Sequence, residues 1–118
     1  EDAEVFAHNL FRMGLMTRAE HSTYRDLYDT VAELVRPPDL MIYLRCPVRA
    51  IRRRIKRRGR PEEQDVPLPY LRQLNRLYED WFQRYDLSPV LVLDTSKLDY
   101  VTDLLDSLEL LAQIERYL

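Results

Sequence analysis

Residues 40–65, LMIYLRCPVRAIRRRIKRRGRPEEQD, contain the clearest indication of the fold. The first part is a short continuous apolar run bounded by prolines, which is typical of a strand covered on both faces. Pro47 then suits the first turn of a helix. At ~100° per residue, Val48, Ile51 and Ile55 share one narrow stripe of that helix. We therefore expect a strand followed by a helix that packs on the sheet.

This strand has a counterpart later in the chain. Residues 88–94, SPVLVLD, are a second run of the same buried type, and residues 67–85 between them have the broad apolar face of a helix. Two apolar strands separated by helices indicate a parallel sheet, so the predicted fold class is α/β, a parallel sheet flanked by helices. Because two strands alone leave exposed edges, we expect further strands upstream or pairing with a second copy of the chain.

Three more helices are expected. Residues 2–13 carry apolar side chains at helical spacing. Thr17 and Glu20 have the spacing of a capping box, which predicts an amphipathic helix that ends before Pro37. A closing helix is predicted over residues 99–118.

The composition favours one domain without a membrane span. Of the 118 residues, 46% are hydrophobic and 32% are charged, as in an ordinary globular domain. The longest apolar runs are far shorter than the ~20 residues that cross a bilayer, and the first residues do not resemble a signal peptide. The lone Cys46 excludes an internal disulfide. We therefore expect a cytoplasmic protein with no membrane partner.

Positive charge is concentrated in one segment. The net charge is −2, but eight of the 18 Lys and Arg residues lie between residues 49 and 60. Two cations 4 Å apart repel by about 1 kcal/mol even in water, so this density favours an anionic ligand. Because the segment has no aromatic residue and turns acidic at Glu62 and Glu63, nucleic acid is disfavoured and a compact phosphate ligand is favoured. The side chains placed to converge on it are Arg54, Arg58 and Arg60.

The glycines limit the kind of phosphate site that the chain can contain. Only Gly14 and Gly59 are present, whereas the loop G-x-x-x-x-G-K-[ST] needs two glycines five residues apart, followed by Lys. The chain therefore has no such loop, and it begins with Glu1 rather than Met. We expect it to be part of a longer protein, with Gly59 as a hinge within this part.

Three segments resemble the deoxynucleoside kinases, P-loop enzymes that phosphorylate the 5'-hydroxyl of deoxyribonucleosides. The segment YLRCPVRAIRRRIKRRGRPEEQDVPLPYLRQLNRLYEDWF resembles the strand, lid and following helix of that family. EDAEVFAHNLF is similar to the segment after its Glu-Arg-Ser motif, and SPVLVLDTSKLDYV to its last core strand and adenine-side loop. The resemblance is most specific at R-x-x-x-R-G-R-x-E-E. It implies that residues 1–118 are one domain, the C-terminal portion of a P-loop kinase fold, with a lid at about residues 54–66 and without the upstream phosphate-loop half.

The resemblance implies roles for residues of the lid. Arg54, Arg58 and Arg60 would be catalytic, holding the donor phosphates of ATP and the phosphoryl group in transfer. Glu63 would accept a hydrogen bond from the sugar 3'-hydroxyl of the substrate. Glu62 would orient one of the lid arginines.

Other substrate contacts are implied by the same resemblance. Asp2 matches the position that hydrogen-bonds the base, and Phe6 matches the ring that stacks against it. Thr95 and Lys97 lie on the loop that contacts ATP. The EDAEVFA segment looks most like the bacterial branch that acts on deoxyguanosine and deoxyadenosine. ATP and Mg²⁺ would be held mainly by residues outside this chain, so this part alone is expected to be inactive.

Two other functions remain open at this point. The basic helix would also suit a non-enzymatic module that binds nucleic acid or assembles with a partner. Thymidylate kinases, which are nucleotide kinases, share a lid arginine pattern but not the sequence that continues it. A homodimer is the expected assembly. His8 and His21 are isolated in the sequence and are assigned no role.

Overall fold

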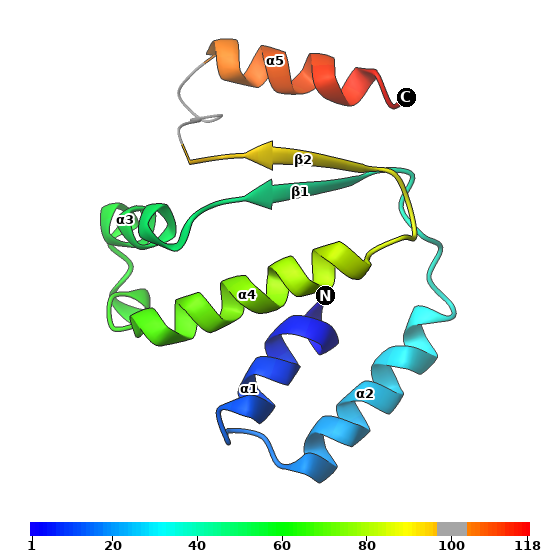
Figure 1. Ribbon diagram of the computed structural model, residues 1–118, viewed down its shortest axis with the longest axis vertical. Coiled ribbons are helices and arrows are strands. Elements are labelled where there is room, and N and C mark those ends of the chain that lie inside the picture. The colour runs from blue at the N-terminus through cyan, green and yellow to red at the C-terminus, as the bar shows by residue number, and fades with distance from the viewer. Residues whose placement is uncertain (97–103) are drawn as a thin grey trace.

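The computed structural model describes residues 1–96 and 104–118 and has an α/β fold (Figure 1). The two strands lie between α5 and α4 in Figure 1, and α3 follows the end of β1. None of the described helices is long and apolar enough to span a membrane. In chain order the elements are η1 (Asp2–Ala7), α1 (His8–Arg12), α2 (Arg18–Ala32), β1 (Met41–Arg45), α3 (Val48–Arg58), η2 (Pro61–Glu63), α4 (Leu68–Arg84), β2 (Val90–Asp94) and α5 (Leu104–Glu115).

The strands form a parallel pair, which confirms the predicted fold class. Met41 lies opposite Val90 and the pairing continues to Arg45 opposite Asp94. The connection between the strands contains α3 and α4, as expected for a parallel crossover. Both strands therefore end on the same side of the molecule, where α3 begins.

The prediction that each strand is covered on both faces is wrong for this chain. Tyr43 in β1 and Leu93 in β2 are buried, whereas their neighbours Leu44 and Val92 are 58% and 39% exposed. Because consecutive side chains of a strand point to opposite faces, each strand is covered on one face only. An apolar run shows that both faces are suited to burial, but it does not show which elements cover them.

The covered face of β1 is held against α4 by one polar and aromatic cluster. The Tyr43 ring stacks on Phe82 with 4.4 Å between ring centroids, and its hydroxyl donates to Glu79 at 3.1 Å. Arg45 donates to both carboxylate oxygens of Glu79 at 3.0 Å. Burial and the Glu79 carboxylate raise the pKa of Tyr43 to about 12, so the hydroxyl remains a donor.

The first helices also pack against α4. The predicted capping box is confirmed: Thr17 accepts from the Glu20 amide at 3.2 Å, and Glu20 accepts from the Thr17 amide at 2.8 Å. Glu4 in η1 joins the helices, because its carboxylate contacts Arg25 of α2 at 2.6 Å and Arg84 of α4 at 3.6 Å. The buried apolar residues of η1 are Ala3, Val5 and Ala7.

The two histidines, which are isolated in the sequence, lie next to each other in the fold. The rings of His8 in α1 and His21 in α2 are 5.6 Å apart. His21 also stacks on Phe11, with 4.7 Å between centroids and an interplanar angle of 5°. An aromatic contact between α1 and α2 therefore contains both histidines of the chain.

This contact predicts a pH-dependent stability. The pKa of His8 lies below its ordinary value of 6.5, because of burial and the nearby Arg12 and His21, which outweigh the opposing effect of Glu4. The unfolded chain then takes up the proton at a higher pH than the folded one, so stability is complete above about 6.5 and declines as the pH falls below it. We expect His8→Gln to flatten this decline between pH 7.5 and 5.5, measured by urea unfolding. If the free energy of unfolding falls with pH to the same extent in the wild-type protein and in His8→Gln, the assignment to His8 is contradicted.

Candidate functional site

Helix α3 contains the basic segment and begins at the carboxyl end of the sheet. Ala50 is buried, and Ile51 and Ile55 are half-buried, so the predicted packing stripe faces the protein. The helix ends at Gly59, which has φ +69° and donates its amide to the Ile55 carbonyl at 3.2 Å. Glycine adopts this left-handed conformation without the penalty that other residues incur. The cations of the last turn also complement the helix dipole, by ~0.3–1 kcal/mol each.

Arg54 links this helix to the ends of both strands. Its guanidinium donates to the Thr95 hydroxyl at 3.1 Å and to the Thr95 carbonyl, and it contacts the Cys46 sulfur at 3.3 Å. Thr95 is 6% exposed and donates its amide to the Arg45 carbonyl at 2.9 Å, directly beyond the strand pair. Two residues that the sequence assigned to ATP, Arg54 and Thr95, are therefore in contact. In α/β folds, ligands bind at the carboxyl ends of the strands, where this contact lies.

A cavity of about 330 Å³ adjoins this contact. Arg54, Arg58 and Thr95 supply its polar groups, and they come from α3 and from the residue after β2. The cavity therefore combines two guanidinium groups with a hydroxyl, which suits an anion with several oxygens. The remaining lining residues are Leu44, Cys46, Ile51 and Ile55.

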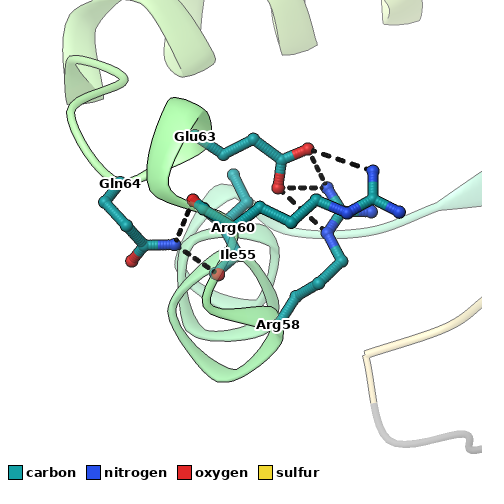
Figure 2. A network of polar contacts seen from close by, with 5 residues as sticks. All are labelled: Ile55, Arg58, Arg60, Glu63 and Gln64. Atoms are coloured by element: carbon teal, nitrogen blue, oxygen red, sulfur yellow. Dashed lines mark hydrogen bonds and ion pairs between the residues drawn. The ribbon is translucent and has the colours of Figure 1, made fainter.

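Two of the three lid arginines, Arg58 and Arg60, gather on one carboxylate, that of Glu63 (Figure 2). Arg58 donates through Nε to Oε2 at 2.9 Å, and through Nη2 to both oxygens at 2.6 Å. Arg60 lies 3.7 Å from the same carboxylate. Arg58 and Arg60 are more than half exposed, so these pairs contribute little stability, about 0–1 kcal/mol. Their importance lies in bringing three predicted site residues together.

The arginine partner expected from the sequence, Glu62, is not the one observed. Glu62 and Glu63 both lie in the single 3-10 turn η2, in which successive side chains point about 120° apart. Glu63 is turned toward the end of α3, and Glu62 is exposed. Sequence spacing could not distinguish the two glutamates, because the choice depends on how the turn meets the helix.

Gln64 is part of the same network and was missed from the sequence. Its side-chain amide donates to the Ile55 carbonyl at 3.1 Å and to the Arg60 carbonyl at 3.0 Å. A glutamine five residues after a helix-ending glycine was the available signal. Glutamine side chains are common on exposed loops, so the residue type alone indicates nothing.

The residues predicted to contact the base lie on a different element from the lid. Asp2 and Phe6 are on η1, and the Phe6 ring contacts Tyr78 of α4 edge to face, at 5.7 Å. Among the described residues, no hydrogen bond or ion pair joins Asp2 to the lid arginines or to Glu63. Lys97, the other predicted ATP contact, lies outside the described residues.

A second hollow separates these two groups. It has a volume of about 360 Å³ and follows the open edge of β1, between α4 and α3. It shares Leu44, Cys46 and Ile51 with the cavity beside Arg54, so the two hollows adjoin. Its other lining residues are Glu1, Met41, Ile42, Tyr43, Asn75, Tyr78 and Trp81.

The sequence matches a known family over its full length. The model of the family described as deoxynucleoside kinase matches residues 1–118. The chain belongs to the deoxynucleoside kinase family. This membership favours a nucleoside kinase over the thymidylate-kinase-like alternative.

Relatives of this deoxynucleoside kinase chain are known in sequence and in structure. A deoxyguanosine kinase from Lactobacillus acidophilus is 37% identical over 97% of this chain and 54% of its own length. A deoxyadenosine kinase from the same organism is 33% identical over 100% of this chain and 59% of its own length. The structure of deoxyadenosine kinase from M. mycoides with bound dCTP superposes with a TM-score of 0.79 at 29% identity, over 96% of this chain and 58% of that one. The chain thus spans little more than half the length of the relatives it matches.

The Arg54–Thr95 contact predicts a measurable contribution to stability. Thr95→Val keeps the shape of the side chain but removes a buried hydroxyl that accepts from Arg54 and donates to the Arg45 carbonyl. We expect the free energy of unfolding to fall by about 1–3 kcal/mol in urea titrations. Thr23→Val, at an exposed position of α2, is the matched control. Equal effects of the two substitutions would show that the hydroxyl contacts contribute nothing specific.

Proposed function

We propose that the complete protein to which these residues belong is an ATP-dependent kinase of deoxyribonucleosides. It transfers a phosphoryl group to the 5'-hydroxyl, and deoxyguanosine and deoxyadenosine are its preferred substrates. The observation that carries the proposal is the cluster of Arg58, Arg60 and Glu63 beside the Arg54–Thr95 contact, in a chain of the deoxynucleoside kinase family. Relatives named for deoxyguanosine and for deoxyadenosine support the choice of purines.

The arginines suit phosphoryl transfer because of where they lie. Arg54 and Arg58 line one cavity, so both guanidinium groups can bind oxygens of one donor phosphate chain. In phosphoryl transfer, positioned cations stabilise the charge that spreads over the moving group. A phosphate oxygen that takes over the Arg58 donor would release the Glu63 carboxylate, which would then accept from the sugar 3'-hydroxyl.

This part of the chain suits the phosphates of ATP better than it suits a metal ion. Arg54, Arg58 and Thr95 provide donors for phosphate oxygens, and we assign Lys97 to the same substrate. Among the described residues, no three His, Cys, Asp or Glu side chains are grouped to hold a metal ion. We assign Mg²⁺, which neutralises charge on the donor phosphates when it is bound, mainly to residues outside this chain. Residues 1–118 alone are expected to be inactive. We also propose that the protein acts in the cytoplasm.

Element η1 supplies the proposed contacts to the base. Phe6 is partly exposed, and its edge-to-face contact with Tyr78 fixes the plane of the ring. A base stacked on such a ring gains ~1–3 kcal/mol. Asp2 is exposed on the same turn, where its carboxylate can accept from an amino group of the base.

The proposal predicts a strong effect at Arg58. In the full-length protein we expect Arg58→Ala to lower kcat for deoxyguanosine phosphorylation by about 10³-fold, because a transition-state cation is lost. ADP release measured with and without deoxynucleoside tests this. Arg57→Ala is the matched control, since it removes an exposed cation from the adjacent position of α3. Unchanged circular dichroism of both variants would confirm that the fold is intact.

Three results would contradict the proposal. Equal turnover by Arg58→Ala and the wild-type protein would remove the role of Arg58. Phosphorylation of a nucleoside monophosphate, but not of a nucleoside, would indicate a nucleotide kinase. Salt-sensitive binding of an oligonucleotide, without nucleoside phosphorylation, would support a nucleic-acid-binding module instead.

We also propose that the protein is a homodimer and that α2 forms the interface. The predicted apolar stripe of this helix is exposed in the described part of the chain rather than packed. A continuous apolar helix face is normally buried, and the same face on a second copy is a self-complementary partner for it. The exposed residues of the stripe are Tyr24, Leu27 and Val31 on α2, and Leu34 and Val35 just after its last residue, Ala32. The sixth predicted member, Tyr28, is half-buried.

The interface predicts that a charge within the stripe produces monomers. Leu27→Glu should convert a dimer into a monomer in sedimentation experiments, because an unpaired carboxylate would be buried on association. Ser22→Glu adds the same charge on the opposite side of α2 and should leave the dimer intact. A monomeric wild-type protein, or a dimer unaffected by Leu27→Glu, would rule out this interface.

A further inference from the structure

The side-chain amide of Gln64 joins the end of α3 to the loop that comes after it (Figure 2). Its nitrogen donates to the Ile55 carbonyl in the last turns of the helix and to the Arg60 carbonyl after the helix has ended. One side chain thus connects positions 55, 60 and 64. Between positions 55 and 64 lie Arg58, Arg60 and Glu63, the three lid residues that form the ion-pair cluster.

The chemistry of this contact requires a donor with two hydrogens. The last carbonyls of a helix have no partner within the helix. The Ile55 carbonyl already accepts from the Gly59 amide at 3.2 Å, and the Arg60 carbonyl accepts from the Glu63 amide at 3.1 Å. Gln64 adds a second donor to each carbonyl, and its NH₂ group has one hydrogen for each. A carboxylate of the same shape has no hydrogen to donate and would repel both oxygens.

The contact also constrains the most flexible point of the loop. Gly59 has φ +69° and no side chain, and the backbone of glycine has more conformational freedom than that of any other residue type. The ion pairs of Glu63 join exposed side chains and hold the loop only weakly. The two hydrogen bonds of Gln64 reach across Gly59 from both sides. They restrict the hinge directly, because they fix backbone atoms before and after it.

We propose that Gln64 is a positioning residue of the lid, which holds Arg58, Arg60 and Glu63 in one preformed arrangement before substrate binds. This inference rests on the proposed kinase function only in its effect on catalysis. A preformed lid places its charged groups without first having to order the loop. Without the Gln64 side chain the lid still has all of its charged side chains. The loop that carries them then adopts many arrangements, of which few are productive.

The test uses Gln64→Met and Gln64→Glu in the full-length protein. Methionine has a similar length and no donor, and glutamate has nearly the same shape with two acceptors. We expect hydrogen exchange of the amides from residue 59 to residue 66 to accelerate about tenfold or more in Gln64→Met, and further in Gln64→Glu. Exchange in α4 should not change. Gln83→Met and Gln83→Glu, at an exposed position of α4, are the matched controls.

The kinetic result separates positioning from a general effect on stability. We expect kcat to fall about tenfold in Gln64→Met, while KM for the deoxynucleoside changes less than threefold, because the Gln64 amide is bonded to two backbone carbonyls and does not line the cavity beside Arg54. If the loop amides of Gln64→Met exchange at the same rate as those of the wild-type protein, the inference is overturned. Faster exchange with unchanged kcat would overturn the positioning role. Absence of deoxynucleoside phosphorylation by the wild-type protein would instead refute the proposed function, and exchange would still decide whether Gln64 holds the loop.

Discussion

Arg54 donates to the side-chain and backbone oxygens of Thr95, and the position of the lid depends on this contact. Thr95 in turn is bonded through its amide to the Arg45 carbonyl, immediately after the parallel pairing ends. Thr95, which is buried, therefore joins the ends of both strands to the middle of α3. Arg58 and Gly59 come only a few residues later on the same helix, so their placement depends on the placement of Arg54.

A helix with so many cations is tolerated because its charges have different surroundings. Arg54 crosses to Thr95, and Arg58 is neutralised by a two-oxygen contact with Glu63. The last turn is favoured by the helix dipole, and the outer arginines are in solvent. The pairing of Arg58 with Glu63 also relates the two proposed substrates, since a phosphate that binds Arg58 would release the carboxylate assigned to the sugar. Gln64 holds this exchangeable pair through backbone carbonyls, which do not take part in the exchange.

The base-side group contacts α4 at Tyr78, and the phosphate-side group lies on α3 and in the turn that follows it; the hollow along the open edge of β1 is lined by residues of both α3 and α4. Only one face of each strand is covered by the residues described here, and the chain spans little more than half the length of its relatives. These two facts agree with a site of which this chain contributes the lid and one wall. Tyr43 keeps α4 along β1 through its stacking on Phe82 and its hydrogen bond to Glu79.

Local patterns were enough to predict much of this molecule. The parallel α/β class, the capping box at Thr17 and the helix end at Gly59 follow from short-range periodicity and backbone preference, which act within a few residues. That Arg54 and Arg58 line one cavity was also foreseeable, because they are four residues apart on one helix. Three other features were not foreseeable: the pairing of Arg58 with Glu63 rather than Glu62, the two hydrogen bonds of Gln64, and the contact between His8 and His21. Each depends on how separate elements meet in space, and a residue's spacing along the chain carries no information about the orientation of a turn relative to a helix that it contacts.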